Sequence, residues 1–190
     1  DYQLVAGALS SRAEVAKESG KNLGLAEDRI YTDFAEMARA EAAREDGIEA
    51  VAIVTPNHMH FAPAKAFLEA GIHVICDKPL TSSIEDAHAL KKVQPKNGAK
   101  FLLTHNYTGY PLIRQARALI ESGALGKLRV VQVEYPQDWL AVEAGDDNKQ
   151  AAWRTDPSKS GAGGAIGDIG THAYNLARYV TGLKTSAVSA

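Results

Sequence analysis

The sequence predicts an α/β fold in which helices flank a parallel β-sheet, followed by a second domain with a different pattern. Two observations predict the sheet. Short apolar runs of strand length alternate with longer segments of helical periodicity, and glycines and capping residues separate them. A third observation predicts the second domain, because after Gly126 this alternation gives way to one longer strand-like segment and a glycine-rich stretch.

The first part of the chain contains alternating strand and helix signals. Short runs of β-branched and small apolar residues are typical of strands buried on both faces, and apolar residues three and four apart indicate helices. In order, the predicted elements are a strand at 3–9, helices at 12–19 and 33–46, a strand at 50–54, a helix at 63–70, a strand at 72–76, a helix at 82–98, a strand at 100–104 and a helix at 112–121.

Capping patterns support several of these helix boundaries. Asp33 with Glu36, and Ser82 with Glu85, each place a cap residue three positions before a glutamate. Glycines favour helix ends because they adopt the left-handed backbone conformation without strain, and they follow three of the predicted helices, at 47, 71 and 98.

The second part of the chain has another organisation. Residues 128–135 alternate between the two faces of a half-exposed strand, and residues 136–167 are loop-rich. A connection of that length in a compact domain is usually functional. We place the domain boundary at residue 106. The chain opens directly into an apolar run and closes on a strand-like stretch at 185–190, so we expect it to be part of a longer protein.

Composition excludes several classes of protein. The 190 residues include 21 basic and 23 acidic side chains, a net charge of −2, and no basic tract that favours nucleic acid. No apolar run approaches the length of a membrane span. The single cysteine, Cys76, ends an apolar run, which predicts a buried thiol in a reducing compartment and hence a cytoplasmic protein.

Polar clusters follow four of the predicted strands. In an open parallel sheet, ligands bind at the carboxyl ends of the strands, so these clusters are expected to share one edge. Polar loops are common in any fold, but four in succession favour a binding site. The clusters are Ser10-Ser11-Arg12, Thr55 to His60, Asp77-Lys78-Pro79 and His105-Asn106-Tyr107.

Lys78 is the most specific of these residues. A lysine directly after an apolar strand is partly removed from water, which favours its use as an acid or a hydrogen-bond donor. Pro79 restricts Lys78 to extended geometry, and a cis bond before the proline would aim the side chain. The alternative is a lysine whose ammonium group simply reaches solvent.

The segment from Gly163 to His172 carries the strongest functional signal. Asp168 and His172 lie four residues apart at the start of an apolar-periodic segment, which puts them on one face of a helix. A histidine oriented by a carboxylate transfers protons near neutral pH. A surface or capping pair with the same spacing is the structural alternative.

Two other groups suggest weaker hypotheses. His58 and His60 could ligate a metal, but they lie in a loop without accompanying cysteine or acidic residues, so no metal site is expected. Trp139, Trp153 and Arg154 lie in the long loop region and are expected to form pocket walls or packing contacts. An arginine beside a tryptophan could hold a sugar or a carboxylate.

Three motifs together resemble the Gfo/Idh/MocA family of NAD(P)-dependent oxidoreductases, and the likeness extends over essentially the whole chain. They are Thr55-Pro56-Asn57-x-x-His60, Asp77-Lys78-Pro79-Leu80 and Gly167-Asp168-Ile169-Gly170-Thr171-His172. The family usually has glutamate where Asp77 stands. The resemblance implies an incomplete Rossmann-type domain at 1–106 and part of an α+β open-sheet substrate domain at 107–190.

The resemblance also implies roles for individual residues in the oxidation or reduction of a sugar, a polyol or a related cyclic compound. Lys78, Asp168 and His172 would form the catalytic set. The cofactor would contact Thr55, Pro56, Asn57, His60, Asp77 and Pro79, and the substrate would contact Asn106, Tyr107, Trp153 and Arg154. The full-length protein is expected to be a homo-oligomer.

The choice between NAD and NADP depends on the end of the first strand. NAD enzymes of this fold often place an acid at the end of the fold's second strand to bind the ribose hydroxyls, and in this chain Ser10, Ser11 and Arg12 occupy that place. A cation in that place slightly favours NADP binding and is also compatible with NAD binding. The glycine-rich turn that binds the pyrophosphate in this family is absent from residues 1–190, which again predicts a longer protein.

Three other functions stay open from the sequence. A redox glycoside hydrolase on the same scaffold would hydrolyse glycosides without net reduction of NAD. A non-catalytic dinucleotide-sensing regulator would show no turnover. A metal-dependent hydrolase or isomerase that uses the histidines would lose activity in EDTA.

Overall fold

The computed structural model describes residues 2–138, 140–142 and 148–189. The described chain divides into two compact units. Unit 1 comprises the residues up to 55 together with 59–103, and unit 2 comprises residues 56–58 together with those from 104 onward.

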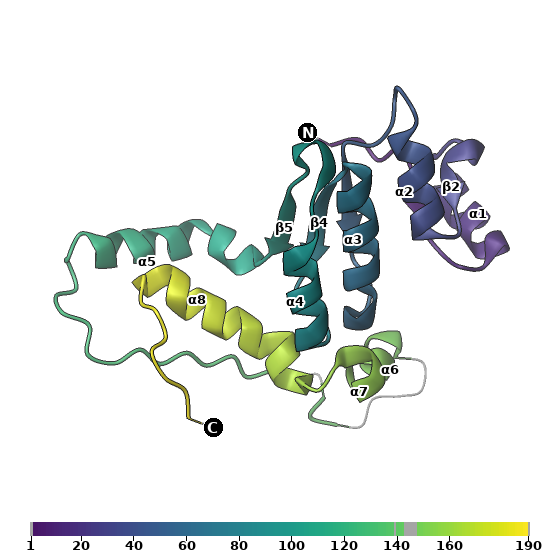
Figure 1. Cartoon of the computed structure of the whole chain (residues 1–190). Helices are drawn as coiled ribbons and strands as arrows, with labels where there is room; N and C mark the ends of the chain where they lie inside the picture. The colour runs from purple at the N-terminus through teal and green to yellow at the C-terminus, as the bar shows by residue number, and fades with distance from the viewer. Residues whose placement is uncertain (1, 139, 143–147, 190) are drawn as a thin grey trace. The chain divides into compact units, whose positions relative to one another are not determined.

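Unit 1 alternates strands and helices, which confirms the predicted α/β class (Figure 1). Its strands form a parallel pair, β1 with β2, and a three-stranded sheet in the order β3-β4-β5. The elements are β1 (Gly7–Ala8), α1 (Ala13–Asn22), β2 (Ile30–Tyr31), α2 (Phe34–Ala42), β3 (Ala50–Ile53), α3 (Phe61–Ala70), β4 (His73–Asp77), α4 (Ile84–Lys92) and β5 (Phe101–Thr104), with 3₁₀ turns at Glu27–Arg29 and Lys96–Gly98. A further 3₁₀ turn, Asn57–Met59, lies mostly in the short segment that belongs to unit 2.

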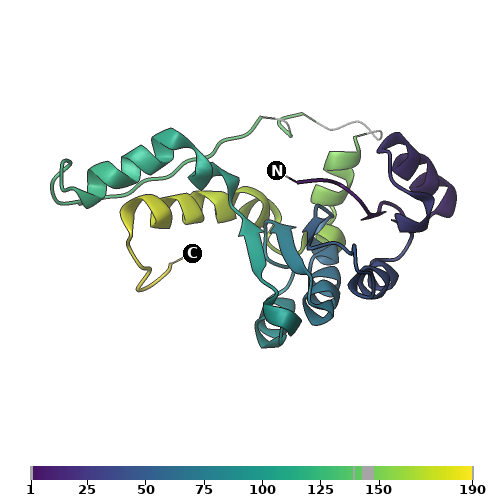
Figure 2. The same ribbon diagram turned by 90° about the horizontal axis from the view of Figure 1, so that it is seen from above.

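Strand β4 is the central strand of the three-stranded sheet. It pairs with β3 in parallel register from Ala50 opposite His73 to Ile53 opposite Cys76. On its other side the Val74 N–H donates to the Lys100 carbonyl at 2.8 Å. Helices α3 and α4 contact each other and lie on one face of this sheet (Figure 2).

The core of unit 1 forms between this sheet and its helices. Val74 and Cys76 on β4 and Phe67 on α3 have at most 1% of their surface exposed. The prediction that Cys76 is a buried thiol is confirmed. Burial, with a smaller contribution from the Asp77 charge, raises the pKa of this thiol to about 12, so it stays protonated and unreactive at neutral pH.

The helix boundaries correct three details of the sequence prediction. Asp33 caps α2 as predicted, accepting a hydrogen bond from the Glu36 N–H at 2.7 Å, but α2 ends at Ala42 rather than near Asp46. The cap of α4 is Ser83, not Ser82. This helix ends at Lys92 rather than near Gly98, because Pro95 cannot donate to the helix and disfavours helical geometry in the residue before it.

A second difference concerns the first strand. Only Gly7 and Ala8 pair with β2, so the strand is much shorter than the predicted 3–9. The described residues before Gly7 belong to no strand, although their apolar character resembles that of a strand.

A buried ion pair joins α2 to the segments around it. Glu41, which is 1% exposed, accepts hydrogen bonds from both Nε and Nη2 of Arg29. It also accepts from the Tyr31 hydroxyl at 2.9 Å and the Ile48 N–H at 3.2 Å. The bond to Glu41 raises the pKa of Arg29. Burial, and then the bond to Glu41, raise the pKa of Tyr31 to about 12.

Gly47 is required where the chain passes the end of α2. A Cβ at this position would lie 2.0 Å from the main-chain oxygen of Glu41, far inside van der Waals contact. The glycine therefore permits the close approach that brings the Ile48 N–H to the Glu41 carboxylate.

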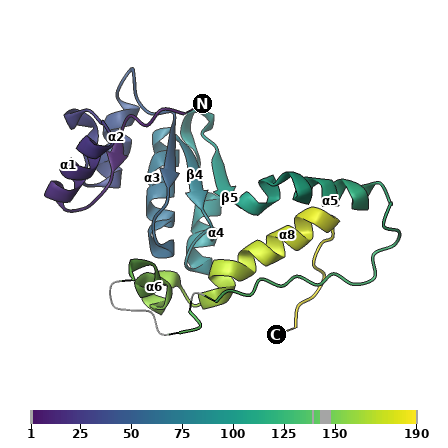
Figure 3. The same ribbon diagram turned by 180° about the vertical axis from the view of Figure 1, so that it is seen from behind.

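Unit 2 is built on two long helices, α5 (Pro111–Glu121) and α8 (Thr171–Thr181), which pack side by side (Figure 3). The Arg117 guanidinium lies over the Tyr179 ring, 4.9 Å from its centroid, and links them. The remaining elements are the 3₁₀ turn Asn106–Gly109, the short helices α6 (Lys149–Arg154) and α7 (Pro157–Ser160), and a π-helical turn at Ile166–Gly170.

Two predicted strands of unit 2 are wrong. Residues 128–135 form no strand, because nothing in the described chain pairs with them, and Val130 is 81% exposed. Residues 185–189 are likewise irregular. An alternating pattern predicts a strand only where a neighbouring strand supplies hydrogen bonds.

In the part of the chain that the structure describes, no helix is both long enough and apolar enough to cross a membrane.

The Glu41 cluster generates a stability prediction. Glu41→Gln removes the buried countercharge of Arg29 while keeping the side-chain shape, so the buried guanidinium keeps only the exposed carboxylate of Asp46, 3.5 Å away. We expect the free energy of unfolding in urea to fall by about 3–5 kcal/mol. The matched change at exposed Glu45, Glu45→Gln, should change it by less than about 0.5 kcal/mol. Equal effects at the two positions would contradict the structural role of Glu41.

Candidate functional site

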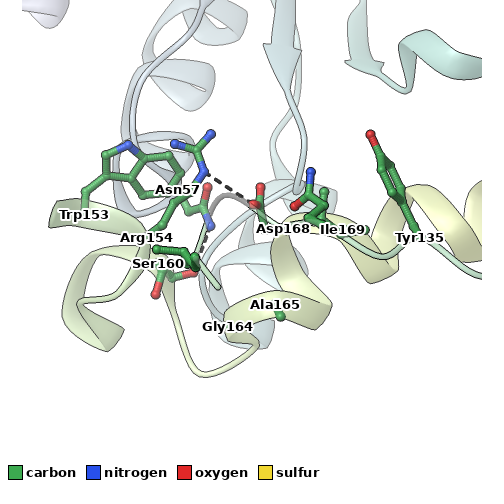
Figure 4. Close-up of a pocket in the computed structure, with 11 residues that line it drawn as sticks. Asn57, Tyr135, Trp153, Arg154, Ser160, Gly164, Ala165, Asp168 and Ile169 are labelled. Carbon is green, nitrogen blue, oxygen red and sulfur yellow. Dashed lines mark hydrogen bonds and ion pairs between the residues drawn. The ribbon is translucent and has the colours of Figure 1, made fainter. Parts of the chain in front are cut away.

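Unit 2 contains a pocket of about 260 Å³ (Figure 4). Its wall is contributed by the short helices, the π-helical turn and the extended segment before them. The lining residues are Asn57, Tyr135, Gln137, Leu140, Trp153, Arg154, Ser160, Gly164, Ala165, Asp168 and Ile169.

An ion pair forms one side of this pocket. The Arg154 Nε lies 3.4 Å from the Asp168 Oδ2, and the Arg154 guanidinium lies 4.2 Å from the centroid of the Trp153 ring. Figure 4 shows the guanidinium between the indole and the carboxylate. Because the two charges are opposite and close together, they give the wall strong hydrogen-bonding groups with little net charge.

Asn57 is fixed within the same wall. Its Nδ2 donates to the Ser160 carbonyl at 2.8 Å, and both residues are buried (Figure 4). The neighbouring His58 Nδ1 lies 3.3 Å from the Lys159 carbonyl oxygen. The amide of Asn57 is thus held in one orientation, which suits a residue that presents its other polar atom to a ligand.

His172 is packed among aromatic rings of unit 2. It is 7% exposed, and its ring centroid lies 4.4 Å from that of Tyr107 and 5.8 Å from that of His105 in an edge-on arrangement. These contacts restrict the imidazole to one orientation. A fixed imidazole is a better proton acceptor than a mobile one because no reorientation is needed during transfer.

Tyr107 connects His172 to the pocket wall. Its hydroxyl lies 2.5 Å from the hydroxyl of Tyr135, which lines the pocket. This hydrogen bond is the main reason that the pKa of Tyr107 is raised to about 12. Tyr107 is therefore a neutral phenol at physiological pH and acts through packing and hydrogen bonding rather than as a base.

Glycines shape the turn that carries Asp168. A Cβ on Gly163 would lie 3.2 Å from the main-chain nitrogen of Gly167, so the two segments approach closely. The predicted helix after the glycine-rich stretch is confirmed as α8, but Asp168 lies in the wider π-helical turn that precedes it. Such turns are frequent at functional sites.

The second cluster lies in unit 1, where β3 and β4 end. The Thr55 hydroxyl donates to the Met59 carbonyl at 3.2 Å. The His60 ring lies between the carbonyl oxygens of Thr55 and Pro79. The Lys78–Pro79 peptide bond is cis, the geometry that the sequence raised as an option.

The residues expected to select the dinucleotide lie between β1 and α1. Ser11 and Arg12 are exposed, and the Arg12 N–H donates to the Ser10 hydroxyl oxygen at 3.1 Å. No carboxylate occurs in the segment from Gly7 to Arg12. An accessible guanidinium without a neighbouring acid in that segment fits the phosphate of an NADP-type cofactor, so these residues are compatible with the predicted cofactor.

The structure brings some of the predicted residues together. Within unit 2 the pocket contains Asn57, Trp153, Arg154 and Asp168, and Tyr107 contacts His172. Asn106 begins the 3₁₀ turn that carries Tyr107. Trp139 lies outside the described residues. Within unit 1, Asp77 is the last residue of β4, and the loops after β3 and β4 contain the predicted residues Thr55, His60, Lys78 and Pro79.

Among the lining residues that were not predicted as site residues are Tyr135 and Ser160, which hydrogen-bond to Tyr107 and Asn57. Tyr135 was interpreted only as a strand position, and Ser160 lies in a segment interpreted as loop. A tyrosine before Pro136 at the start of a long connection is the only signal that could have identified the first of them. The described residues contain no group of three or more His, Cys, Asp or Glu side chains that could hold a metal ion.

Two family models match the chain. An oxidoreductase family model with an NAD-binding Rossmann fold matches residues 1–116. The model of the GFO/IDH/MocA C-terminal domain matches residues 113–190.

Curated relatives are also oxidoreductases. The uncharacterised oxidoreductase YfiI of Bacillus subtilis is 39% identical over 180 residues, which cover 94% of this chain and 46% of that protein. The levoglucosan dehydrogenase of Pseudarthrobacter phenanthrenivorans is 39% identical over 143 residues, which cover 75% of this chain and 35% of that enzyme. The chain thus spans less than half the length of these two relatives.

The solved structures that resemble this chain include an oxidoreductase and a homologue of a dehydrogenase. An oxidoreductase from Sinorhizobium meliloti is 57% identical with a TM-score of 0.82, and the match covers 96% of this chain and 46% of that one. An inositol dehydrogenase homologue from Azotobacter vinelandii in complex with NAD+ is 38% identical with a TM-score of 0.89, covering 95% and 46%.

The tyrosine pair generates a prediction that titration can test. Tyr135→Phe removes the hydrogen bond that is the main cause of the raised pKa of Tyr107, so that pKa should fall from about 12 toward its ordinary value of about 10. Nuclear magnetic resonance of ring-labelled tyrosine measures it.

The matched control for this titration is Tyr174→Phe, which removes a hydroxyl that pairs with Thr185 at 2.9 Å. It should leave the pKa of Tyr107 unchanged. A Tyr107 pKa that is the same in Tyr135→Phe and in the wild type would show that burial, not the hydrogen bond, controls it.

Proposed function

The chain belongs to the GFO/IDH/MocA family of oxidoreductases, and from this premise we propose that the protein transfers a hydride between NAD(P) and a hydroxyl-bearing carbon of a sugar, a polyol or a related cyclic compound. The observation that carries the proposal is the pocket of unit 2, where the carboxylate of Asp168 is paired with Arg154 beside an indole ring.

The chemistry of this pocket suits a neutral, hydroxyl-rich ligand. An aromatic face accepts the C–H surface of a sugar ring, while a carboxylate, a guanidinium and an amide supply hydrogen bonds to its hydroxyls. The inositol dehydrogenase homologue has also been crystallised with NADH and myo-inositol, and the relative from Pseudarthrobacter is a levoglucosan dehydrogenase. Both compounds are small cyclic molecules with several hydroxyls, which supports this substrate class.

We assign the proton transfer to His172. In the oxidation, the hydroxyl proton of the substrate passes to the imidazole, and in the reduction the imidazole returns it. The packing of this ring against Tyr107 and His105 supports the role because it fixes the imidazole in one orientation.

We assign two supporting roles to Lys78 and Asp168. Lys78 donates a hydrogen bond to the reacting oxygen and stabilises the negative charge that develops there as the proton leaves. Asp168 contacts the substrate or orients His172, and its pairing with Arg154 holds the carboxylate in place.

When bound, the nicotinamide takes the hydride from the carbon or returns it. Thr55, Pro56, Asn57, Asp77 and Pro79 would lie along the cofactor. Arg12 would pair with the phosphate on the ribose if that cofactor is NADP, and Ser10 and Ser11 would bind its oxygens.

The activity test uses the full-length protein. It is incubated with NAD+ or NADP+ and a panel that contains myo-inositol, levoglucosan and D-xylose, and the absorbance of the reduced nicotinamide is followed. Reduction that depends on one of these compounds is the expected result. Net hydrolysis of glycosides without net reduction, or no turnover with any hydroxyl compound, would overturn the proposal.

Lys78→Ala and His172→Ala should each lower kcat at least about a hundredfold, the usual effect of removing a proton-transfer group or a stabilising donor. Steady-state kinetics with saturating cofactor measures this. Lys91→Ala, at an exposed position on α4, is the control and should retain wild-type kcat. Wild-type turnover in either active-site variant would refute the role given to that residue.

Arg12→Ala should weaken NADP+ binding by at least about tenfold and leave NAD+ binding nearly unchanged, because a hydrogen bond to a charged group contributes about 1.5–3 kcal/mol. Titration calorimetry with both dinucleotides gives the ratio of dissociation constants. Arg39→Ala, an exposed change on α2, should leave the ratio as it is. An unchanged ratio in Arg12→Ala would remove Arg12 from cofactor selection.

A further inference from the structure

His60 is more deeply buried than a residue that contacts a cofactor needs to be. Only 1% of its surface is exposed, and it directly precedes α3. The sequence resemblance placed it among the cofactor-binding residues together with Thr55 and Pro79. Its environment indicates a different task, because little of the ring is available to a bound molecule.

Both ring nitrogens of His60 are engaged by main-chain oxygens. Nδ1 lies 2.8 Å from the Pro79 carbonyl oxygen, and Nε2 lies 2.9 Å from the Thr55 carbonyl oxygen. A carbonyl oxygen only accepts hydrogen bonds, and both distances are those of good N–H···O bonds. The ring therefore lies within hydrogen-bonding distance of both oxygens and bridges them, and the nitrogen that carries the hydrogen donates it.

These two bonds join the loops that follow neighbouring strands. Thr55 lies just after β3 and Pro79 just after β4, and the last paired residues of these strands are Ile53 and Cys76. The Thr55 hydroxyl donates to the Met59 carbonyl and closes the first loop on itself. The His60 ring then fixes the spacing between this closed loop and the segment that carries Lys78.

We propose that His60 is a positioning residue for Lys78: its ring bridges the carbonyl oxygens of Thr55 and Pro79 and so holds Lys78 where it can reach the reacting oxygen. The link to catalysis rests on the proposed role of Lys78. The bridge itself does not, since it concerns only unit 1.

The first test is spectroscopic and needs no activity. In full-length protein labelled with ¹⁵N in histidine, a ring N–H of His60 should exchange with water much more slowly than the ring N–H of exposed His88, because the His60 ring is buried between two carbonyl oxygens. His60→Ala and His88→Ala identify the two signals. A His60 ring N–H that exchanges as fast as that of His88 in the folded wild type would overturn the proposal.

The second test separates the contact of His60 with Pro79 from its contact with Thr55. The amide nitrogen of asparagine occupies roughly the position of Nδ1, and that of glutamine roughly the position of Nε2. His60→Asn thus keeps a donor for Pro79 beside Lys78, whereas His60→Gln keeps only the donor for Thr55. We expect kcat to fall less than about tenfold in His60→Asn and about a hundredfold in His60→Gln, the range for residues that orient a catalytic group.

Cofactor affinity distinguishes positioning from direct contact. If His60 positions Lys78, the dissociation constants for NAD+ and NADP+ should stay within about threefold of wild type in both variants while kcat falls. A large loss of cofactor affinity with wild-type kcat at saturation would return His60 to the cofactor-binding residues and overturn the proposal. His88→Asn, the same change at an exposed position on α4, is the control.

The outcomes also separate this inference from the proposed function. If the wild type oxidises no hydroxyl compound, the dehydrogenase proposal fails, and hydrogen exchange still decides whether the His60 ring is held between the two loops. If the wild type is active and His60→Gln retains full kcat, the dehydrogenase proposal stands and the positioning role fails.

Discussion

The parallel register of β3 and β4 is the constraint on which the candidate chemistry of unit 1 depends. Because Ile53 lies opposite Cys76, the chain leaves both strands at the same level of the sheet, and the loops that begin at Thr55 and Lys78 start side by side. The pairing is held by apolar burial, since Val74 and Cys76 of the central strand are completely enclosed. A shift of one residue would turn these side chains away from the core and would separate the two loops.

The candidate site of unit 2 is held in place by different interactions. Few of its residues are deeply buried, and its site depends on polar and aromatic pairs rather than on a sheet. Arg154 is held between Trp153 and Asp168, and His172 is held by Tyr107, whose hydroxyl bonds to Tyr135. In each case a residue from an irregular segment or a short helix fixes the orientation of a side chain to which we assign substrate binding or proton transfer.

The sequence predicted most elements of unit 1 because their signals are local. The cap at Asp33 and the apolar runs of β3 and β4 act within a few residues, and the structure confirms them. The errors arose where the outcome depends on a distant partner. Residues 128–135 have the alternation of a strand but no described neighbour to pair with, and Pro95 ends a helix whose periodicity continues past it. The pocket contact of Asn57 with Ser160, which lie 103 positions apart, has no local signature at all.

The fully enclosed thiol of Cys76 has a practical consequence. It is the only cysteine among the 190 residues, and its high pKa and burial keep it from reacting with alkylating probes while unit 1 is folded. Within these 190 residues, a cysteine introduced at an exposed position therefore becomes the single labelling point without any change to the native core. Pairs of such substitutions, one in each unit, would carry spin labels or fluorophores and report how the separation of the units responds to dinucleotide and to sugar.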